Sequence, residues 1–283
     1  MPAVKVPPIK SQGIKTKLIP WLDAHAPKVI EGAWIEPFMG TGAVAFNLAR
    51  SRASIARLAD NNPHVVAFYA DLVAGRITPP GLRQFLEVEG ALLNQRGADH
   101  YYAVRQRFNK HGSPLDFLFL NRSCFNGMMR FNKSGGFNTP FCKRDNRFAP
   151  AMITKIVNQA SMVLKSLEGM RVTFKCQDFR TTVMEAGPCD MVYADPPYAG
   201  RSADYFQGWG EQDEKDLSAA LTDLDQRKGR FMVSTWHHTA YRQNDNLAKF
   251  WSPFKIQTVA HTYHLGGKVE NRQPVTEALI MNF

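Results

Sequence analysis

The sequence lacks the cysteine patterns that hold structural metal ions. Its four cysteines are Cys124, Cys142, Cys176 and Cys189. They form no Cys-x-x-Cys pair, and no cluster of cysteine and histidine has the spacing of a zinc site. Isolated cysteines of this kind are typical of reduced thiols in an intracellular protein. We therefore expect no bound metal.

Long apolar runs are also missing. No stretch is long enough to span a bilayer, and residues 1–8 lack the apolar core of a signal peptide. We therefore expect a cytoplasmic protein without a membrane partner. The chain has 283 residues, enough for one large domain or for a core domain with an insertion.

Acidic residues are fewer than basic ones. The chain has 25 Asp and Glu residues against 35 Lys and Arg residues, which gives a formal net charge of +10. This excess favours a polyanionic partner such as nucleic acid, and a merely basic soluble enzyme is the alternative. Apolar residues make up 44% of the chain and charged residues 21%, as expected of a globular protein.

The order of the apolar segments predicts an α/β fold. Runs that indicate strands alternate with segments of helical spacing, which favours a mostly parallel sheet. The expected strands are 34–38, 55–59, 172–176, 191–194, 231–235, 255–263 and 277–283, and the expected helices are 18–22, 43–49, 65–74, 153–167 and 211–224. Residues 75–147 interrupt the alternation, because they are helical at first and loop-rich later. We predict a core of residues 1–74 and 148–283 with residues 75–147 inserted.

A glycine loop lies between the first core strand and the helix after it. Gly40 and Gly42 would let the backbone turn sharply and approach a ligand, although an ordinary strand-to-helix turn is the alternative. Asp60 ends the next strand, where such folds place an acid that binds ribose hydroxyls; its other reading is a turn or capping acid. The expected nucleoside contacts in these two loops are Glu36, Pro37, Phe38, Gly40, Gly42, Asp60 and Asn61.

The glycine loop is not a complete dinucleotide fingerprint. Asn47, and not glycine, follows later in the expected helix. This difference favours a nucleoside without a pyrophosphate over NAD. S-adenosylmethionine (SAM) fits that description.

A second distinctive segment is Asp195-Pro196-Pro197-Tyr198, directly after the apolar run 191–194. Ligands of open α/β sheets lie at the carboxyl ends of strands. The Asp195 carboxylate and the Pro196 carbonyl could accept hydrogen bonds from an exocyclic amine of adenine or cytosine, and Tyr198 could stack on the ring. The prolines fix the backbone and donate no hydrogen bond. A base in duplex DNA must leave the helix to reach such a site. The alternative is a proline-rich turn with a surface acid.

Together, Phe38-Met39-Gly40-Thr41-Gly42 and the tetrapeptide at 195–198 resemble the signature of DNA adenine-N6 methyltransferases. The motif order, with an insertion between them, resembles the Dam-type subgroup. That resemblance implies a Rossmann-like SAM-binding domain (residues 1–74 and 148–283), interrupted by a mainly helical DNA-recognition domain (75–147) that carries a β-hairpin. It also implies a bacterial or phage-encoded, DNA-associated enzyme.

Further segments resemble this family. Residues 10–15 are similar to the motif that closes over the methionine part of SAM, which implies cofactor contacts for Ser11 and Lys15. The family usually has an aromatic where Ser11 stands and a second glycine where Ile14 stands. Gln177-Asp178-Phe179 resembles the motif whose acid binds the cofactor adenine, so Asp178 and Phe179 join the predicted site. The segments 235–237 and 271–277 resemble the motif behind the flipped base and the family's last motif.

Residues 121–141 resemble the family's recognition hairpin and lie in a strongly basic stretch with interleaved phenylalanines. Arg130 is our candidate for a base-reading residue, because a bidentate arginine–guanine contact is the commonest specific one. Phe125 and Asn126 are expected to wedge into the stack or to fill the space of a flipped base. The structural alternative is that the basic residues form a solvated face and that the phenylalanines form a small core beneath it. The full set of expected DNA contacts is Arg122, Phe125, Asn126, Arg130, Asn132, Lys133 and Asn138.

These observations predict an enzyme that methylates N6 of adenine in double-stranded DNA by base flipping and direct displacement, as a monomer or weak dimer. Three rivals remain at this stage: methylation of cytosine N4 or of RNA adenine, a DNA-binding protein that keeps the fold without activity, and a dinucleotide-dependent oxidoreductase. Asp195 favours adenine over cytosine, since a serine is common there in cytosine-N4 enzymes of the superfamily. No motif specifies the DNA sequence that the enzyme would recognise. Nor does any motif assign the enzyme to a restriction system, a phage or a housekeeping pathway.

Overall fold

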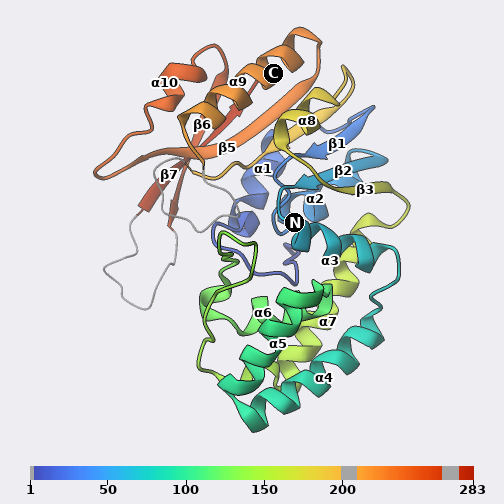
Figure 1. The fold of residues 1–283 in the computed structure, drawn as a ribbon. Coiled ribbons are helices and arrows are strands. Elements are labelled where there is room, and N and C mark those ends of the chain that lie inside the picture. Colours follow the sequence, from blue (N-terminus) through green and yellow to red (C-terminus); the bar gives the residue numbers. More distant parts are fainter. Residues whose placement is uncertain (1–2, 199–208, 263–273) are drawn as a thin grey trace.

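A computed structural model of the chain describes residues 3–198, 209–262 and 274–283. Within these ranges, seven strands form one sheet in the order β3-β2-β1-β4-β5-β7-β6 (Figure 1). The strands are β1 (Ala33–Glu36), β2 (Ile55–Asp60), β3 (Arg171–Cys176), β4 (Met191–Ala194), β5 (Arg230–Thr239), β6 (Lys255–Thr262) and β7 (Pro274–Met281). The pairs among β1 to β5 are parallel, whereas β7 is antiparallel to β5 and β6. The sheet confirms the predicted Rossmann-like α/β class.

The strand order reverses between β1 and β4. From β1 the chain proceeds to β2 and β3 on one side, and it later returns to β4 and β5 on the other side. Ile35 of β1 pairs with Arg57 of β2 and also with Val192 of β4. The loops that leave the carboxyl ends of β1 and β4 therefore flank the topological switch point, where open α/β sheets bind their ligands.

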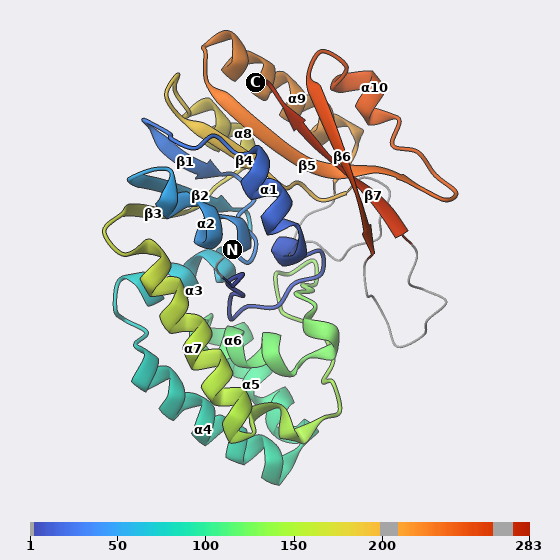
Figure 2. The ribbon, with the colours of Figure 1, turned by 180° about the vertical axis from the view of Figure 1, so that it is seen from behind.

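Alternate residues of the central strands enter different cores, because side chains of a strand point to opposite faces. Ala33 and Ile35 pack with α8 (Phe179–Met184) and α9 (Glu211–Gln226), whereas Trp34 packs in the core that contains α1 (Ile19–His25) and α2 (Ala43–Leu48). Figure 2 shows α1 and α2 in front of the sheet, with α9 farther away. The helices that cover the sheet are α1 (Ile19–His25), α2 (Ala43–Leu48), α3 (Pro63–Val73), α8 (Phe179–Met184), α9 (Glu211–Gln226) and α10 (Asn246–Phe250).

The helical part of residues 75–147 forms a body beside the sheet (Figures 1 and 2). It contains α4 (Pro79–Arg96), α5 (Ala98–His111) and α6 (Pro114–Ser123), and α7 (Pro150–Leu167) packs along α4 before the chain enters β3. Its side chains Leu86 and Phe119 belong to the same apolar core as Trp34. Four short 3-10 turns complete the secondary structure of the described residues: η1 (Lys15–Leu18), η2 (Ala49–Ser51), η3 (Phe125–Gly127) and η4 (Asp145–Phe148).

The expected β-hairpin within residues 121–141 is wrong in detail. Asn121 and Arg122 lie in the last turn of α6, and residues 124–141 form an antiparallel loop, here called the recognition loop. Its limbs meet only through isolated bridges, Cys124–Phe141 and Phe131–Phe137. Side chains replace ladder partners: the Thr139 hydroxyl, for example, accepts the backbone N–H of Arg130. Of the aromatic residues that suggested strands, Phe131, Phe137 and Phe141 pack against the apolar core.

Candidate active site and nucleic-acid interface

Two acidic side chains meet at the switch point. Glu36 ends β1 and is buried, and Asp195 directly follows β4. The pKa of Glu36 is raised to about 8, chiefly by burial and also by the nearby Asp195 charge, while a 2.9 Å hydrogen bond from Trp34 Nε1 to Glu36 Oε1 opposes the shift. The site therefore favours the protonated form of Glu36 more than water does.

Asp195 forms an ion pair with Lys15. The Lys15 Nζ lies 3.0 Å from Asp195 Oδ1, and the Lys15 side chain is only 4% exposed. Burial raises the pKa of Asp195, and the Lys15 ammonium opposes this shift. The ion pair thus favours the carboxylate form of a partly buried acid. It also brings the predicted N-terminal cofactor motif into contact with the predicted catalytic tetrapeptide.

Tyr198 is held from two sides. Its hydroxyl donates a 2.5 Å hydrogen bond to Glu277 Oε2 of β7, and Lys15 Nζ lies 4.7 Å from the ring centroid. The ring is buried in a small cluster with Trp236 and Val275. Pro196 is buried and Pro197 is half-buried between Asp195 and this anchored ring. The tetrapeptide is therefore not a solvated surface turn.

The glycine loop is fastened to Asp60. Gly40 N–H donates to Asp60 Oδ2 and Asn62 N–H donates to Asp60 Oδ1, each at 2.8 Å. Asp60 thus fulfils the turn role that the sequence offered as an alternative, and each oxygen keeps acceptor capacity for a ligand hydroxyl. Burial raises its pKa, and the two backbone donors oppose the shift.

Gly40 and Gly42 both have positive φ angles, 48° and 73°. A Cβ added at Gly42 would lie 2.3 Å from the Phe46 ring, whereas a Cβ at Gly40 would meet no atom within 4 Å. Gly42 is therefore required by packing, and Gly40 has open space beside its backbone. Of the neighbouring loop residues, Pro37 is buried and Asn61 is exposed.

Three aromatic rings pack together at the carboxyl ends of the parallel strands. Phe38 stacks on Phe179 with a centroid distance of 5.2 Å, and Trp209 lies 5.4 Å from each of them. The sequence analysis did not identify Trp209, which is fixed by a hydrogen bond to Glu214. Asp178 is exposed and caps α8 through the Arg180 N–H at 2.8 Å. The Ser11 hydroxyl donates to the Gln12 carbonyl at 3.0 Å.

The recognition loop presents some of the expected DNA-contacting residues. Phe125 is 51% exposed, and Asn126 is exposed with a left-handed φ of 54°. Arg130 Nε donates to Asn138 Oδ1 at 3.1 Å, so these two predicted contacts lie together. Lys133 is exposed at the tip, where the Asn132 side chain accepts the backbone N–H groups of Ser134 and Gly136.

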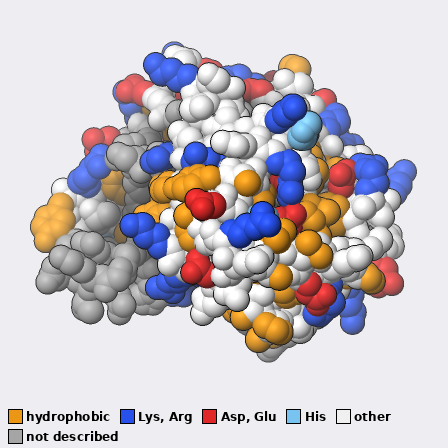
Figure 3. All heavy atoms as spheres, turned by 60° about the horizontal axis from the view of Figure 1, so that its bottom comes forward, with side chains coloured by type: hydrophobic (Ala, Val, Ile, Leu, Met, Phe, Trp, Pro, Cys, Tyr) orange, Lys and Arg blue, Asp and Glu red, His pale blue; other side chains and the backbone are white. Residues whose placement is uncertain are grey.

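Two of the basic residues bind groups of the protein itself. Arg122 is buried and donates to the Pro8 carbonyl at 3.0 Å, and burial lowers its pKa to about 10. Arg107 pairs with Glu89 and Asp116. Figure 3 shows basic side chains spread over this end of the molecule among apolar and a few acidic ones. Exposed basic residues of the segment include Lys110, Lys133, Lys143 and Arg144.

The end of β5 carries the segment expected behind the target base. Thr235 and Trp236 are buried, and Asn244 donates to the Trp236 carbonyl at 2.8 Å. Sequence reasoning missed Asn244, which approaches β5 from a later loop. The predicted motif residues Asn271 and Arg272 lie outside the described residues.

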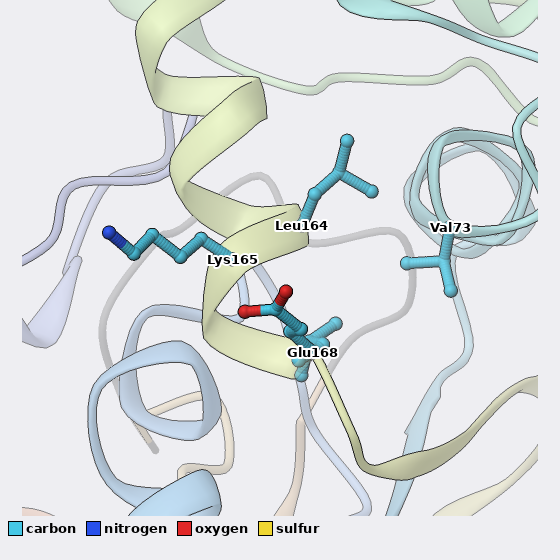
Figure 4. A pocket seen from close by; sticks show the side chains of 5 residues that line it. Val73, Leu164, Lys165 and Glu168 are labelled. Atoms are coloured by element: carbon cyan, nitrogen blue, oxygen red, sulfur yellow. The ribbon is translucent and has the colours of Figure 1, made fainter.

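A surface pocket of about 530 Å³ lies away from this site, between the C-terminal ends of α3 and α7 (Figure 4). Val73, Leu164 and Leu167 line it together with Lys165 and Glu168. None of the predicted site residues contributes to this pocket. No described helix is both long and apolar enough to cross a membrane.

Comparison with known proteins identifies the family. The model for the D12 class of N6 adenine-specific DNA methyltransferases matches residues 11–265. The type II methyltransferase M.MjaIII of Methanocaldococcus jannaschii is 26% identical, over 98% of this chain and 99% of its own length. The DNA adenine methylase of Serratia marcescens is 32% identical, over 69% of this chain and 67% of its own. A DNA adenine methylase of Vibrio cholerae is 29% identical, over 78% of this chain and 76% of its own.

A solved structure of a precorrin-6y C5,15-methyltransferase from Geobacter metallireducens overlaps 98% of this chain at 10% identity with a TM-score of 0.42. Because this structural likeness is weak, the assignment of the chain to a family rests on the family model and the sequence relatives. The matched region contains both the glycine loop and the tetrapeptide at 195–198. This chain belongs to the D12 class of N6 adenine-specific DNA methyltransferases.

Proposed function

We propose that this chain flips an adenine out of duplex DNA and methylates its N6 at the carboxyl ends of β1 and β4, with SAM as the donor. The observation that carries this assignment is the ion pair between Lys15 and Asp195 beside the glycine loop held by Asp60. When bound, SAM supplies a methyl group on a sulfonium sulfur. The remaining chemistry is positioning and hydrogen bonding by the protein.

The residues at the switch point fit such a cofactor. The Asp60 carboxylate can accept ribose hydroxyls, and the open space beside Gly40 permits close approach of a ligand to the backbone. Phe38, Phe179 and Trp209 offer an aromatic wall for an adenine ring. We propose cofactor contacts for Ser11, Lys15, Glu36, Pro37, Phe38, Gly40, Gly42, Asp60, Asn61, Asp178, Phe179 and Asp195.

Asp195 is proposed to hold the target amine. Lys15 contacts Oδ1, so we place the N6 hydrogen bond on Oδ2 and a second one on the Pro196 carbonyl. These acceptors would draw the nitrogen lone pair out of conjugation with the ring and direct it toward the methyl group. The Lys15 ammonium favours the ionised form of Asp195 and opposes the effect of burial. Tyr198, anchored by Glu277, would form a fixed wall for the flipped base.

We propose residues 75–147 as the target-recognition region. Arg130, braced by Asn138, would read a base, and Phe125 and Asn126 would enter the space that the flipped adenine leaves. Asn132 would shape the turn that carries Lys133. Arg122 is assigned an indirect role, because its guanidinium binds the Pro8 carbonyl inside the protein. One chain carries both sites, which is compatible with a cytoplasmic enzyme that acts on DNA as a monomer or weak dimer.

Product identification tests this function. The protein is incubated with methyl-labelled SAM and with unmethylated plasmid DNA or RNA, and the labelled nucleosides are separated. We expect N6-methyldeoxyadenosine from the plasmid. Labelled N4-methyldeoxycytidine, or label found only in RNA, would assign the site to another amine.

A further inference from the structure

One buried side chain connects the recognition loop with the N-terminal segment of the active site. Asn121 lies in the last turn of α6 and is fully buried. Its Oδ1 accepts the backbone N–H of Lys10 at 2.8 Å, and its Nδ2 donates to the Lys10 carbonyl at 2.8 Å. The same Nδ2 donates to the Gly127 carbonyl at 3.3 Å. A single amide thus binds Lys10 on both backbone groups and also holds the recognition loop.

The recognition loop and the N-terminal segment are closely packed at Gly127 and Lys10. Gly127 has a φ of 67°, and a Cβ at that position would lie 2.8 Å from the Lys10 Cβ. The neighbouring Arg122 binds the Pro8 carbonyl at 3.0 Å. Residues 8–15, here called the N-terminal strap, are therefore fixed to α6 at Pro8 and at Lys10. A shift of Gly127 would move the strap, because neither the glycine nor the amide has room to absorb it.

The strap ends at the catalytic acid. Lys15 follows Lys10 by five positions and pairs with Asp195 at 3.0 Å. In the recognition loop, Gly127 directly follows Asn126, which is exposed in a left-handed turn next to the exposed Phe125. The path from the surface of the recognition loop to the Asp195 carboxylate therefore contains Gly127, the Asn121 amide, Lys10 and Lys15.

We propose that Asn121 is a positioning residue that couples DNA contact at the recognition loop to the placement of Lys15 against Asp195. This coupling rests on the proposed function of the two ends. Asn121 itself is buried and touches neither substrate nor cofactor. Its role would be to transmit contacts of Phe125 and Asn126 with a duplex to the position of Lys15 against Asp195.

Two substitutions of Asn121 test the coupling. Asn121→Ala removes all three hydrogen bonds. Asn121→Asp keeps the Oδ1 acceptor for Lys10 N–H but turns a carboxylate toward the carbonyls of Lys10 and Gly127. Ser123→Ala is the matched control, because Ser123 is equally buried in the same turn and its hydroxyl donates only within α6, to the Phe119 carbonyl at 2.6 Å.

The measured quantities are the single-turnover rate on unmethylated plasmid DNA, the Kd for that DNA, and hydrogen exchange of the strap amides with and without DNA. We expect both Asn121 variants to lose on the order of tenfold or more in rate, with DNA affinity nearly unchanged. DNA should slow exchange in the strap of the wild type and of Ser123→Ala, but not in Asn121→Ala. Lower pH should bring the rate of Asn121→Asp closer to that of the wild type at the same pH, because a protonated carboxyl can again donate.

Unchanged rates in both variants would overturn the coupling, and so would DNA-induced protection of the strap in Asn121→Ala equal to that in the wild type. Thermal unfolding identifies a variant that fails to fold. If Asn121→Ala does not fold, the rate and the strap exchange of the isosteric Asn121→Asp test the coupling instead. Failure of the proposed function itself is visible separately, as absence of N6-methyladenine from the wild-type reaction. In that case the exchange measurement with plasmid DNA still decides whether the loop and the strap are linked.

Discussion

The hydroxyl of Tyr198 donates a hydrogen bond to Glu277, a residue 79 positions later in the chain. The contact joins the loop after β4 to β7, the antiparallel strand of the sheet. It fixes the last residue of the tetrapeptide at 195–198 and gives the buried Glu277 carboxyl a donor. The tetrapeptide is therefore braced by β7 at Tyr198 and by the N-terminal strap at Asp195.

Replacing Tyr198 by Phe separates bracing from stacking. Tyr198→Phe removes a hydrogen bond to a buried carboxyl, so we expect a loss of about 1–3 kcal/mol in the free energy of unfolding. The ring remains, and the methylation rate should fall much less than in Tyr198→Ala. Denaturant unfolding and single-turnover assays measure the two effects. Equal rate losses in both variants would show that the hydroxyl, and not the ring, is what the reaction needs.

The Lys15–Asp195 pair predicts a pH dependence. Burial raises the pKa of Asp195 and Lys15 lowers it, so the Lys15→Met variant should have an Asp195 pKa higher than that of the wild type. If the carboxylate is the active form, the rate falls as pH decreases through this pKa. The acid limb of the rate profile should therefore move to higher pH in Lys15→Met. An acid limb at the same pH in both proteins would contradict this role of Lys15.

The two glycines of the cofactor loop should respond differently to alanine. Both have positive φ, which costs an alanine about 1–2 kcal/mol. Gly42→Ala also forces a Cβ against Phe46, so its unfolding free energy should fall by a further 1–3 kcal/mol, roughly. Gly40→Ala places its Cβ in open space, and we expect it chiefly to weaken SAM binding. Denaturant unfolding should show the larger loss of stability in Gly42→Ala, and calorimetry should show the larger rise in the SAM Kd in Gly40→Ala. If one variant has the larger loss in both measurements, the distinct roles given to the two glycines are contradicted.

Arg130 and Lys133 form a matched pair for DNA recognition. Arg130, which is hydrogen-bonded to Asn138, should contact a base. In Arg130→Ala the difference in binding free energy between a duplex with the recognition sequence and a scrambled duplex should therefore shrink by about 1–3 kcal/mol. Lys133 is exposed at the loop tip, and Lys133→Ala should weaken binding to both duplexes alike and reduce the salt dependence. Binding titrations at two salt concentrations measure both effects. Equal losses on the two duplexes for Arg130→Ala would assign it to phosphate contact.

The sequence predicted the sheet well because strand periodicity and glycine punctuation are local signals. The short helices α8 and α10 were missed, since a few residues carry too little periodicity to separate a helix from a loop. The motif residues Asp195, Lys15 and Asp60 were identified by type and order, but their pairings were not, because each depends on segments far apart in the chain. Arg122 shows the limit most clearly: composition places it on a basic surface, whereas the fold buries it against Pro8.

The most direct measurement compares the wild type with Asp195→Asn in single-turnover methylation of unmethylated plasmid DNA, with the Kd values for SAM and DNA determined in parallel. Asparagine keeps the shape of the side chain and removes the charge that accepts the amine. We predict a loss of about 10²–10³ in rate, with both Kd values nearly unchanged. A rate equal to that of the wild type would contradict the proposal that the Asp195 carboxylate holds the target adenine amine.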